Sequence, residues 1–275
     1  MKSQKIHRQK AIIDLLQEHG KVETALLSRD LGVTEMTIRR DIEQLEKEGV
    51  LYRVYGGAVP TSGRSFEPPF SIRLTQKTES KTAIATQAAR LVPRGANVAL
   101  DFGTKTYFVA KELRKHPGAL IAPTGLHAAR ELAKNPAIRI LMPGGHLKPN
   151  ELSIYGSDAE DFFRSHRWDV SLVSIAGIDT DQGLTDYNRS DAKLKASLIH
   201  NSDCVVILAE ERYLGAVSFA PVGSLEKVHI VVTDAHPDHK SLTDFHKRGI
   251  NIISTQNPPH EGDGFAGAEP DRDTD

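Results

Sequence analysis

The stretch Val33-Thr34-Glu35-Met36-Thr37-Ile38-Arg39-Arg40-Asp41-Ile42-Glu43-Gln44-Leu45 decides the architecture of the N-terminal region, because it predicts an amphipathic helix together with its start. Thr34 is a favourable N-cap, and Glu35 lies in the first turn, where the helix dipole stabilises negative charge. Ile38, Ile42 and Leu45 recur at steps of four and three residues and form one apolar stripe. The other side chains of the first turns are therefore expected on or beside the exposed face.

The segments before this helix complete a helix-turn-helix pattern. A first amphipathic helix is expected to stop near Gly20, and a short second helix to run from about Thr24 to Leu31, with Ala25 and Leu26 packed inward. Gly32 can end that second helix and turn the chain sharply. In helix-turn-helix proteins, the N-terminal residues of the following helix reach base edges and phosphates.

A short extended run follows the helix, from Gly49 to Gly57, and predicts a small hairpin, or wing, that lays Arg53 against a DNA backbone. Exposed arginines on a helix are common in any protein. Three spaced helices, a glycine turn and a wing together nevertheless favour DNA binding. The candidate DNA contacts are Thr34, Glu35, Met36, Thr37, Arg39, Arg40 and Arg53.

The charge of this region is weak for a DNA-binding domain. Residues 1–60 hold 10 Lys and Arg against 9 Asp and Glu, a net charge of +1. Because phosphate contacts supply much of the affinity of such domains, binding must depend on local placement of arginines and on two copies acting together. A double-stranded DNA partner and at least a dimer are therefore expected.

The whole-chain composition fits a two-domain protein of the cytoplasm. The 275 residues carry a net charge of −1, which encodes no general attraction to nucleic acid or membranes. A single cysteine, Cys204, excludes an internal disulfide framework and suits a reducing compartment. No signal peptide and no apolar run of about 20 residues is present, so no membrane span is expected.

The chain divides into four predicted regions: a winged helix-turn-helix domain over 1–58, a linker over 59–78, an α/β domain over 79–256 and a disordered acidic tail over 257–275. Prolines and glycines between Val59 and Gln76 suggest the linker. Apolar runs then alternate with helical stretches, at 98–100, 120–122, 138–141, 170–175, 205–208 and 230–232. This alternation predicts a mostly parallel sheet. The last twenty residues hold six acidic residues and one basic residue, too polar to form a core.

Polar turns follow the first strands of the α/β domain, where ligands bind in open parallel sheets. Asp101, Gly103, Thr104, Lys105 and Thr106 follow the first strand and open a helix, whose free N–H groups can hold an anion. Thr124 and Gly125 follow the second strand, and Gly145 the third. Three such turns converging on one site suggest a phosphorylated small molecule.

The N-terminal motifs resemble those of the DeoR family of bacterial transcriptional regulators. The family's T-I-R-R-D-L, L-E and L-x-R-x-H-G-G-A elements are nearly reproduced at 37–42, 45–46 and 51–58, with Tyr55 in place of the usual histidine. Gly177-Ile178-Asp179, Gly183-Leu184-Thr185, Asn188, Asp191-Ala192 and Lys195 resemble elements of the family's sensor domain. The resemblance covers roughly residues 5 to 235.

The resemblance implies a regulator, most often a repressor of carbohydrate catabolism, controlled by a phosphorylated sugar or polyol. It implies a sensor domain with the fold of ribose-phosphate isomerases and CoA transferases. With the strand-end turns, it adds Asp179, Thr185, Asn188 and Lys195 to the expected effector contacts. Asp179 and Asn188 could instead only organise turns. One departure is Glu210-Glu211-Arg212-Tyr213, where the family has D-S-S-K; Arg212 or Lys105 would have to replace that lysine.

Two other functions are open from the residues. A sugar-phosphate isomerase with an appended DNA-binding domain could use Asp179 or Asp191 as a base and Lys195 to stabilise an enediolate. His236, His239 and His246 could form a metal site, although their spacing matches no known ligand pattern. The attached helix-turn-helix favours sensing over catalysis. No nucleotide-binding or nucleophile motif is present, and we expect no bound cofactor.

Overall fold

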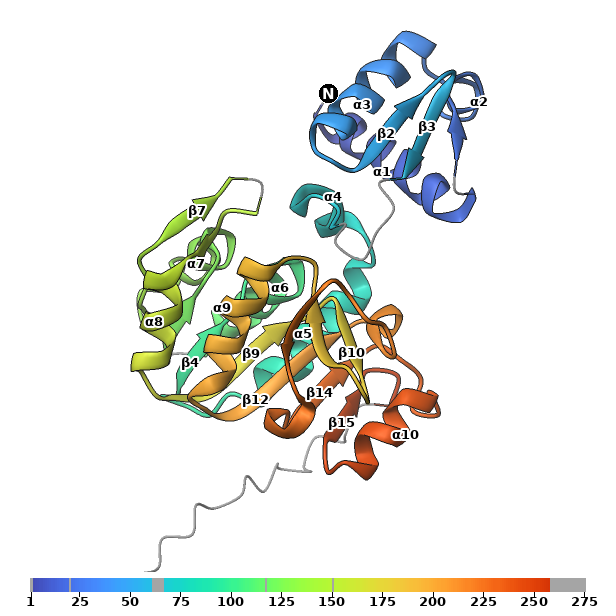
Figure 1. Ribbon diagram of the computed structural model, residues 1–275. Helices are drawn as coiled ribbons and strands as arrows, with labels where there is room; N and C mark the ends of the chain where they lie inside the picture. The colour runs from blue at the N-terminus through green and yellow to red at the C-terminus, as the bar shows by residue number, and fades with distance from the viewer. Residues whose placement is uncertain (1, 20, 61–66, 117, 150, 258–275) are drawn as a thin grey trace, which may run out of the picture.

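A computed structural model describes residues 2–19, 21–60, 67–116, 118–149 and 151–257. It forms a small N-terminal unit and a larger α/β unit (Figure 1). This arrangement confirms the predicted fold class, a winged helix-turn-helix domain followed by an α/β domain with a mostly parallel sheet. The N-terminal elements are α1 (Lys2–His19), β1 (Val22–Glu23), α2 (Thr24–Asp30), α3 (Glu35–Lys47), β2 (Leu51–Val54) and β3 (Gly57–Pro60).

Helix α3 begins where its cap predicts. The Thr34 side chain accepts a hydrogen bond from the Thr37 backbone N–H at 3.3 Å, and Ile38, Ile42 and Leu45 are buried in the core of the small unit. The second helix differs from expectation, because Ala25 and Leu26 are both exposed and Leu27 is buried instead. Leu27 has the helical phase that points toward α1 and α3, which the local pattern alone did not reveal.

The predicted wing is a hairpin of β2 and β3, and β1 pairs with β3 on the other side. Gly56 turns the hairpin with a φ of +76°, a conformation that favours glycine. At Gly57 a side chain would collide with the Val22 carbonyl, so β1 and the wing pack without space between them.

The α/β unit contains a seven-stranded parallel sheet in the order β15-β14-β12-β9-β4-β5-β6. The six predicted apolar runs all lie in it, and β15 is an additional edge strand. The strands are β4 (Asn97–Leu100), β5 (Leu120–Pro123), β6 (Arg139–Ile140), β9 (Trp168–Ser174), β12 (Ser202–Ala209), β14 (Ile230–Thr233) and β15 (Asn251–Ser254).

Helices cover both faces of this sheet, and each face has its own core. Alternating residues of β12 show the two faces: Val206 and Leu208 pack with α5, α6 and α7, whereas Val205 and Ile207 pack with α8, α9 and α10. The helices are α5 (Thr78–Arg90), α6 (Thr104–Leu113), α7 (Leu126–Leu132), α8 (Ser157–Ser165), α9 (Arg189–His200) and α10 (Lys240–Lys247).

Smaller elements surround the main sheet. Strands β10 (Gly177–Asp179), β11 (Gly183–Asp186) and β13 (Ala220–Gly223) form an antiparallel sheet, and β7 (His146–Lys148) pairs with β8 (Ser153–Tyr155) as a hairpin. Two 3₁₀ turns lie at Glu211–Tyr213 and Leu225–Lys227. None of the helices in the described residues is both long and apolar enough to cross a membrane.

The predicted linker contains a short helix, α4 (Phe70–Thr75), between the two units (Figure 1). Ile72 is buried in the core of the winged helix-turn-helix unit, and the Phe70 ring stacks on His127 of α7 with a centroid distance of 4.0 Å. One helical turn therefore contacts both domains. The domain boundaries stay a prediction, and nearly all of the expected acidic tail lies outside the described residues.

Candidate functional site

The exposed side of α3, with the wing, is the first candidate site, and we call it the recognition face. Met36 is 57% exposed although it is apolar, and Thr34, Glu35, Arg39 and Arg40 are exposed as predicted. Arg39 forms an ion pair with Glu35 at 3.2 Å, whereas Arg40 has no ion-pair partner among the described residues. The first turns of α3 thus present a free cation, a paired cation and hydroxyl groups to solvent.

Two acidic residues of α3, Asp41 and Glu46, form ion pairs with other elements of the small unit. Asp41 is buried and forms an ion pair with Arg8 of α1. Glu46 accepts the backbone N–H of Arg53 at 3.0 Å and pairs with its guanidinium at 2.7 Å. These contacts tie α1 and the wing to α3, and they occupy two of the acidic residues of the region in the fold.

The wing contributes residues that the motif analysis did not select. A groove of about 450 Å³ lies between α3 and the wing, and its lining includes Arg39, Arg53, Val54 and Tyr55. Tyr55, at the hairpin tip, is fully exposed. An aromatic ring held in water at the tip of a wing is suited to contact a sugar or base. The position of Tyr55 beside the glycines of the predicted hairpin turn could have identified it as an exposed residue of the wing.

The second candidate site lies at the carboxyl edge of the parallel sheet. We call it the sheet-edge cluster, and it consists of Asp101, Lys105, Asp186, Asp191, Lys195 and Glu210. Asp101 follows β4 and Glu210 follows β12, so the strands deliver both carboxylates to one edge. Both are almost completely buried. Buried carboxylates are retained only with partners, and each has a cation beside it.

Lys195 is the central cation of this cluster. From α9, its ammonium contacts Asp186 at 2.5 Å and Asp101 at 3.3 Å, and it donates a hydrogen bond to the Ser174 carbonyl at 2.7 Å. Burial disfavours the charged amine, but the two carboxylates outweigh this effect and raise the pKa of Lys195. Burial also raises the pKa of Asp101 to about 6.

Glu210 organises the other half of the cluster. It pairs with Arg212 at 3.3 Å and lies 3.9 Å from the Lys105 ammonium, which sits 4.6 Å from the centre of the Tyr213 ring. Burial lowers the pKa of Lys105 to about 8, because desolvation exceeds the attraction of Glu210. Lys105 and Arg212 thus place two cations near Tyr213, where the family lysine is absent.

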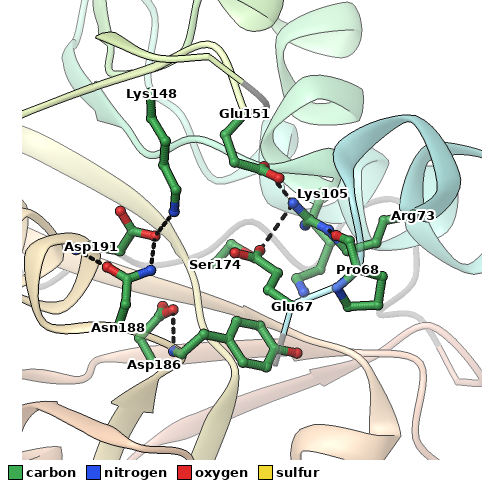
Figure 2. Close-up of polar contacts among 12 residues, drawn as sticks. Glu67, Pro68, Arg73, Lys105, Lys148, Glu151, Ser174, Asp186, Asn188 and Asp191 are labelled. Atoms are coloured by element: carbon green, nitrogen blue, oxygen red, sulfur yellow. Dashed lines mark hydrogen bonds and ion pairs between the residues drawn. The ribbon is translucent and has the colours of Figure 1, made fainter. Parts of the chain in front are cut away.

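Asn188 and Asp191 form a cap that also binds a cation. Asn188 is the N-cap of α9: its side-chain oxygen accepts the Asp191 N–H at 3.0 Å, and its amide donates to the Asp191 carboxylate at 2.6 Å. Lys148 of β7 contacts the same carboxylate at 2.8 Å (Figure 2). The other Asp191 oxygen is buried with no hydrogen-bond partner among the described residues.

The predicted glycine and threonine turns lie at the same edge. Gly103 precedes α6 with a φ of +114°, Thr104 is buried at its first residue, and Thr106 is buried and donates to the Gly103 carbonyl at 3.1 Å. The Thr124 hydroxyl is buried without a hydrogen-bond partner among the residues described. Two predicted glycines permit close backbone packing: a side chain at Gly125 would touch Phe102, and one at Gly145 would lie 2.7 Å from the Tyr155 carbonyl.

Two expected effector residues have structural partners instead. Asp179 accepts the backbone N–H groups of Asp181 and Gln182, both at 2.9 Å, and so organises the turn between β10 and β11. It pairs with Gly183, three residues from Asp186 in the same hairpin, which corresponds to about 10 Å along a strand. Thr185 is buried and accepts the Ser218 N–H. We therefore leave both out of the site proposed below.

Three residues that sequence reasoning missed form a group beside the cluster, which we call the linker group: Glu67, Arg73 and Glu151. The Arg73 guanidinium contacts both carboxylates, with Glu67 at 3.0 Å (Figure 2). All three side chains are at most 15% exposed. Glu67 and Arg73 stand in the proline-containing linker, where no motif marks them. Asp186, which directly follows the G-L-T element, could have been found as its next polar residue.

The alternative functions gain little from these contacts. Asp179 binds turn amides, and one carboxylate oxygen of Asp191 is held by Lys148 and Asn188. No group of three or more potential metal ligands occurs within the described residues, and His236 contacts Asp238. Paired charges suit a binding site that recognises a polar molecule.

Comparison with known proteins assigns each half of the chain. The model of the DeoR-like helix-turn-helix domain matches residues 8–63, and that of the DeoR C-terminal sensor domain matches residues 76–235. The glycerol-3-phosphate regulon repressor of Escherichia coli K12 is 32% identical over 242 residues, covering 87% of this chain and 96% of that protein. The Bacillus subtilis transcriptional repressor GlcR is 29% identical over 247 residues, covering 90% and 95%.

Among solved structures, ribose 5-phosphate isomerase A from Methanocaldococcus jannaschii aligns with a TM-score of 0.37 and 14% identity, over 50% of this chain and 55% of that chain.

Proposed function

This chain belongs to the DeoR family of transcriptional regulators, and we propose that it represses a carbohydrate or polyol catabolic operon under the control of a phosphorylated effector. One observation carries the proposal. A single chain joins an exposed recognition face to a buried cluster of ion pairs at the carboxyl edge of a parallel sheet. The first is suited to DNA and the second to a small polar ligand.

The recognition face supports a defined mode of DNA binding. In our proposal α3 enters the major groove, Arg40 and Arg39 bind phosphates or base edges, and Thr34, Met36 and Thr37 approach the bases. Arg53 is held by Glu46 and Tyr55 is exposed, so the wing would contact the adjacent backbone. Because a net charge of +1 over residues 1–60 attracts DNA weakly, we propose that the chain binds as a homo-oligomer, at least a dimer. The single cysteine supports a cytoplasmic location.

The effector site we propose comprises the sheet-edge cluster with the start of α6, Thr124, Asn188 and Lys148. The hydroxyl of Thr124 and one oxygen each of Asp101 and Asp191 are buried without hydrogen-bond partners among the described residues. Such atoms are costly unless a ligand or water binds them, and sugar hydroxyls are suitable donors. The free N–H groups of α6 are suited to the phosphate.

Control of DNA binding requires that the effector prefer one arrangement of the two domains. In this proposal the effector stabilises the arrangement that binds the operator poorly, and its differential affinity sets the size of the response. Relatives named for glycerol-3-phosphate regulon repression make polyol phosphates the first ligands to test.

The test is fluorescence anisotropy of the full chain on DNA from upstream of its own gene, with and without a panel of sugar and polyol phosphates. We expect specific binding that one phosphate ester releases. Specific binding that no phosphate ester alters would contradict the effector class, and no specific binding to that region would contradict an operator beside its own gene.

Thr104→Val provides the matched test of the sensor site. Thr104 is buried at the first residue of α6, and valine replaces its hydroxyl with a methyl group of similar size. We expect unchanged operator affinity and an effector response reduced about tenfold, corresponding to one lost hydrogen bond to a charged ligand. An unchanged response would remove Thr104 from the site. Conversion of ribose 5-phosphate above background would favour the isomerase hypothesis.

A further inference from the structure

We propose that Arg73 is the anion-binding residue of the effector site and that the linker carboxylate Glu67 is a built-in competitor for it. The inference rests on the proposed function, because it assumes that a phosphorylated effector binds at the sheet edge. It assigns the phosphate to a cation outside the predicted site. It also makes the linker between the two domains the segment that the effector displaces.

The other cations of the site pair with carboxylates on, or directly after, regular elements; Lys105 and Arg212 share Glu210, which directly follows β12. Lys195 of α9 pairs with Asp186 of β11 and with Asp101, which directly follows β4. Lys148 of β7 pairs with Asp191 of α9. To free either ammonium, an incoming phosphate would have to separate packed strands and helices. These pairs are therefore suited to bind the hydroxyl groups of a ligand and poorly suited to exchange partners.

Arg73 differs because one of its partners is on the linker. Glu67 lies outside any helix or strand and contacts Arg73 Nη2 at 3.0 Å; Glu151 contacts the same Nη2, and the Pro68 carbonyl accepts a hydrogen bond from Nε. Withdrawal of Glu67 would leave a guanidinium still positioned by Glu151. Arginine offers a planar fork of donors that matches phosphate.

The free edge of this guanidinium faces a second anion-binding feature. No hydrogen bond or ion pair of the described residues uses Arg73 Nη1, which lies 3.9 Å from the position that a Cβ on Gly103 would occupy. Gly103 precedes the ten-residue helix α6, whose first N–H groups lack intrahelical partners. A phosphate between Nη1 and the α6 N-terminus would receive donors from both sides.

The Glu67 carboxylate lies among the charged residues of the proposed effector site. Figure 2 shows Glu67 with Arg73, Glu151 and Asp186, and the charges of these three residues and of Lys195 on α9 act on its carboxylate. Burial raises the pKa of Glu67 to about 7, so its ionised form is held at a cost. A phosphate ester that is anionic at neutral pH is a stronger partner for Arg73 and can replace it.

Displacement of Glu67 would reach the DNA-binding domain through α4. Arg73 lies in this helix, next to Ile72, which is buried in the winged helix-turn-helix core. Gln76, directly after α4, donates a hydrogen bond to Asp14 of α1 at 3.1 Å. Lys81 binds the backbone carbonyls of Arg73 and Gln76, which fixes the helix end to α5. Because Pro68, next to Glu67, accepts a hydrogen bond from Arg73 Nε, movement of the Glu67 segment would be transmitted through α4 to groups that hold α1.

The experiment compares Glu67→Gln with Glu79→Gln, an exposed carboxylate at the start of α5, in the full chain with inorganic phosphate as the probe. Isothermal titration calorimetry should show about tenfold tighter phosphate binding for Glu67→Gln, because a competitor that fills the site nine-tenths of the time lowers apparent affinity tenfold. Glu79→Gln should match the wild type. Equal or weaker binding by Glu67→Gln would overturn the proposal.

Arg73 is tested in the same way with two variants. Arg73→Gln should lose phosphate binding, and Arg73→Lys, which keeps the charge without the fork, should retain weak binding; unchanged affinity in either variant would overturn the assignment. Operator binding tests the coupling separately from the role of Arg73 in phosphate binding.

Glu67→Gln should bind the operator about tenfold more weakly than the wild type without any effector, and wild-type affinity would overturn the coupling. If the wild type binds no operator, the repressor function fails while the phosphate titrations still decide the role of Arg73.

Discussion

The recognition face and the sheet-edge cluster use charge in opposite ways. On α3 and the wing, charged groups lie at the surface, where Arg40 is free and Arg39 has one exposed partner. At the sheet edge, Lys195 is buried among three oxygen atoms. The difference shows that exposed charges can stay available for an outside partner, whereas buried charges must be paired within the protein before any ligand binds.

The strongest way to break this comparison is Lys195→Met. Removal of a buried cation leaves Asp101 and Asp186 without their partner, and loss of one member of a buried pair costs about 3–5 kcal/mol. Urea unfolding monitored by circular dichroism should show this loss. The control is Lys193→Met, an exposed lysine of the same helix, which we expect to change stability by less than about 0.5 kcal/mol. Equal effects of the two variants would contradict the internal pairing.

Arg40→Ala tests the opposite behaviour at the recognition face. Because Arg40 is exposed and unpaired among the described residues, we expect the free energy of unfolding to stay within about 0.5 kcal/mol of the wild type. Operator binding should weaken by about 1–3 kcal/mol, while phosphate binding stays unchanged. Lys47→Ala, in the last turn of α3, is the control and should weaken operator binding less. Equal operator affinity in Arg40→Ala would remove α3 from the DNA interface.

Thr34→Ala has the smallest expected effect and tests a residue with two roles, because Thr34 caps α3 and is also exposed on the recognition face. Loss of the N-cap should cost about 1 kcal/mol in the free energy of unfolding. Thr34→Ser keeps the capping oxygen and should restore that stability. Chemical denaturation measures both variants. If serine restores stability and full operator affinity, the methyl group of Thr34 has no role in recognition.

Local patterns predicted one region better than the other. The α3 cap, the apolar stripe and the wing are set by residues within about 25 positions of each other, so the sequence displays them directly. The strand positions and the turn at Gly103 were also predicted, because parallel strands bring their carboxyl ends together.

The contacts of the second site depend on residues far apart in the chain. Arg73 and Glu151 are 78 positions apart, and no periodicity connects a linker arginine with a hairpin loop. Asp179 was selected because it matches the family's G-I-D element, yet β10 belongs to a side hairpin whose turn Asp179 organises. The predicted inward residues of α2 were wrong, because Ala25 and Leu26 are exposed and Leu27 is buried; helical phase depends on packing partners as well as on the local pattern.

Ile72 completes the core of the DNA-binding domain from outside the segment that matches that domain's family model. The two family matches end at residue 63 and begin at residue 76, so this side chain belongs to neither, yet it is buried in the core of the DNA-binding half. A recombination event or an engineered fusion that cuts the chain at the end of the first match would leave that core one side chain short. Transplanting the DNA-binding half as an independent unit therefore requires a cut after Gln76, which keeps α4 and the hydrogen bond to Asp14. Such a unit also carries Arg73 of the proposed effector site.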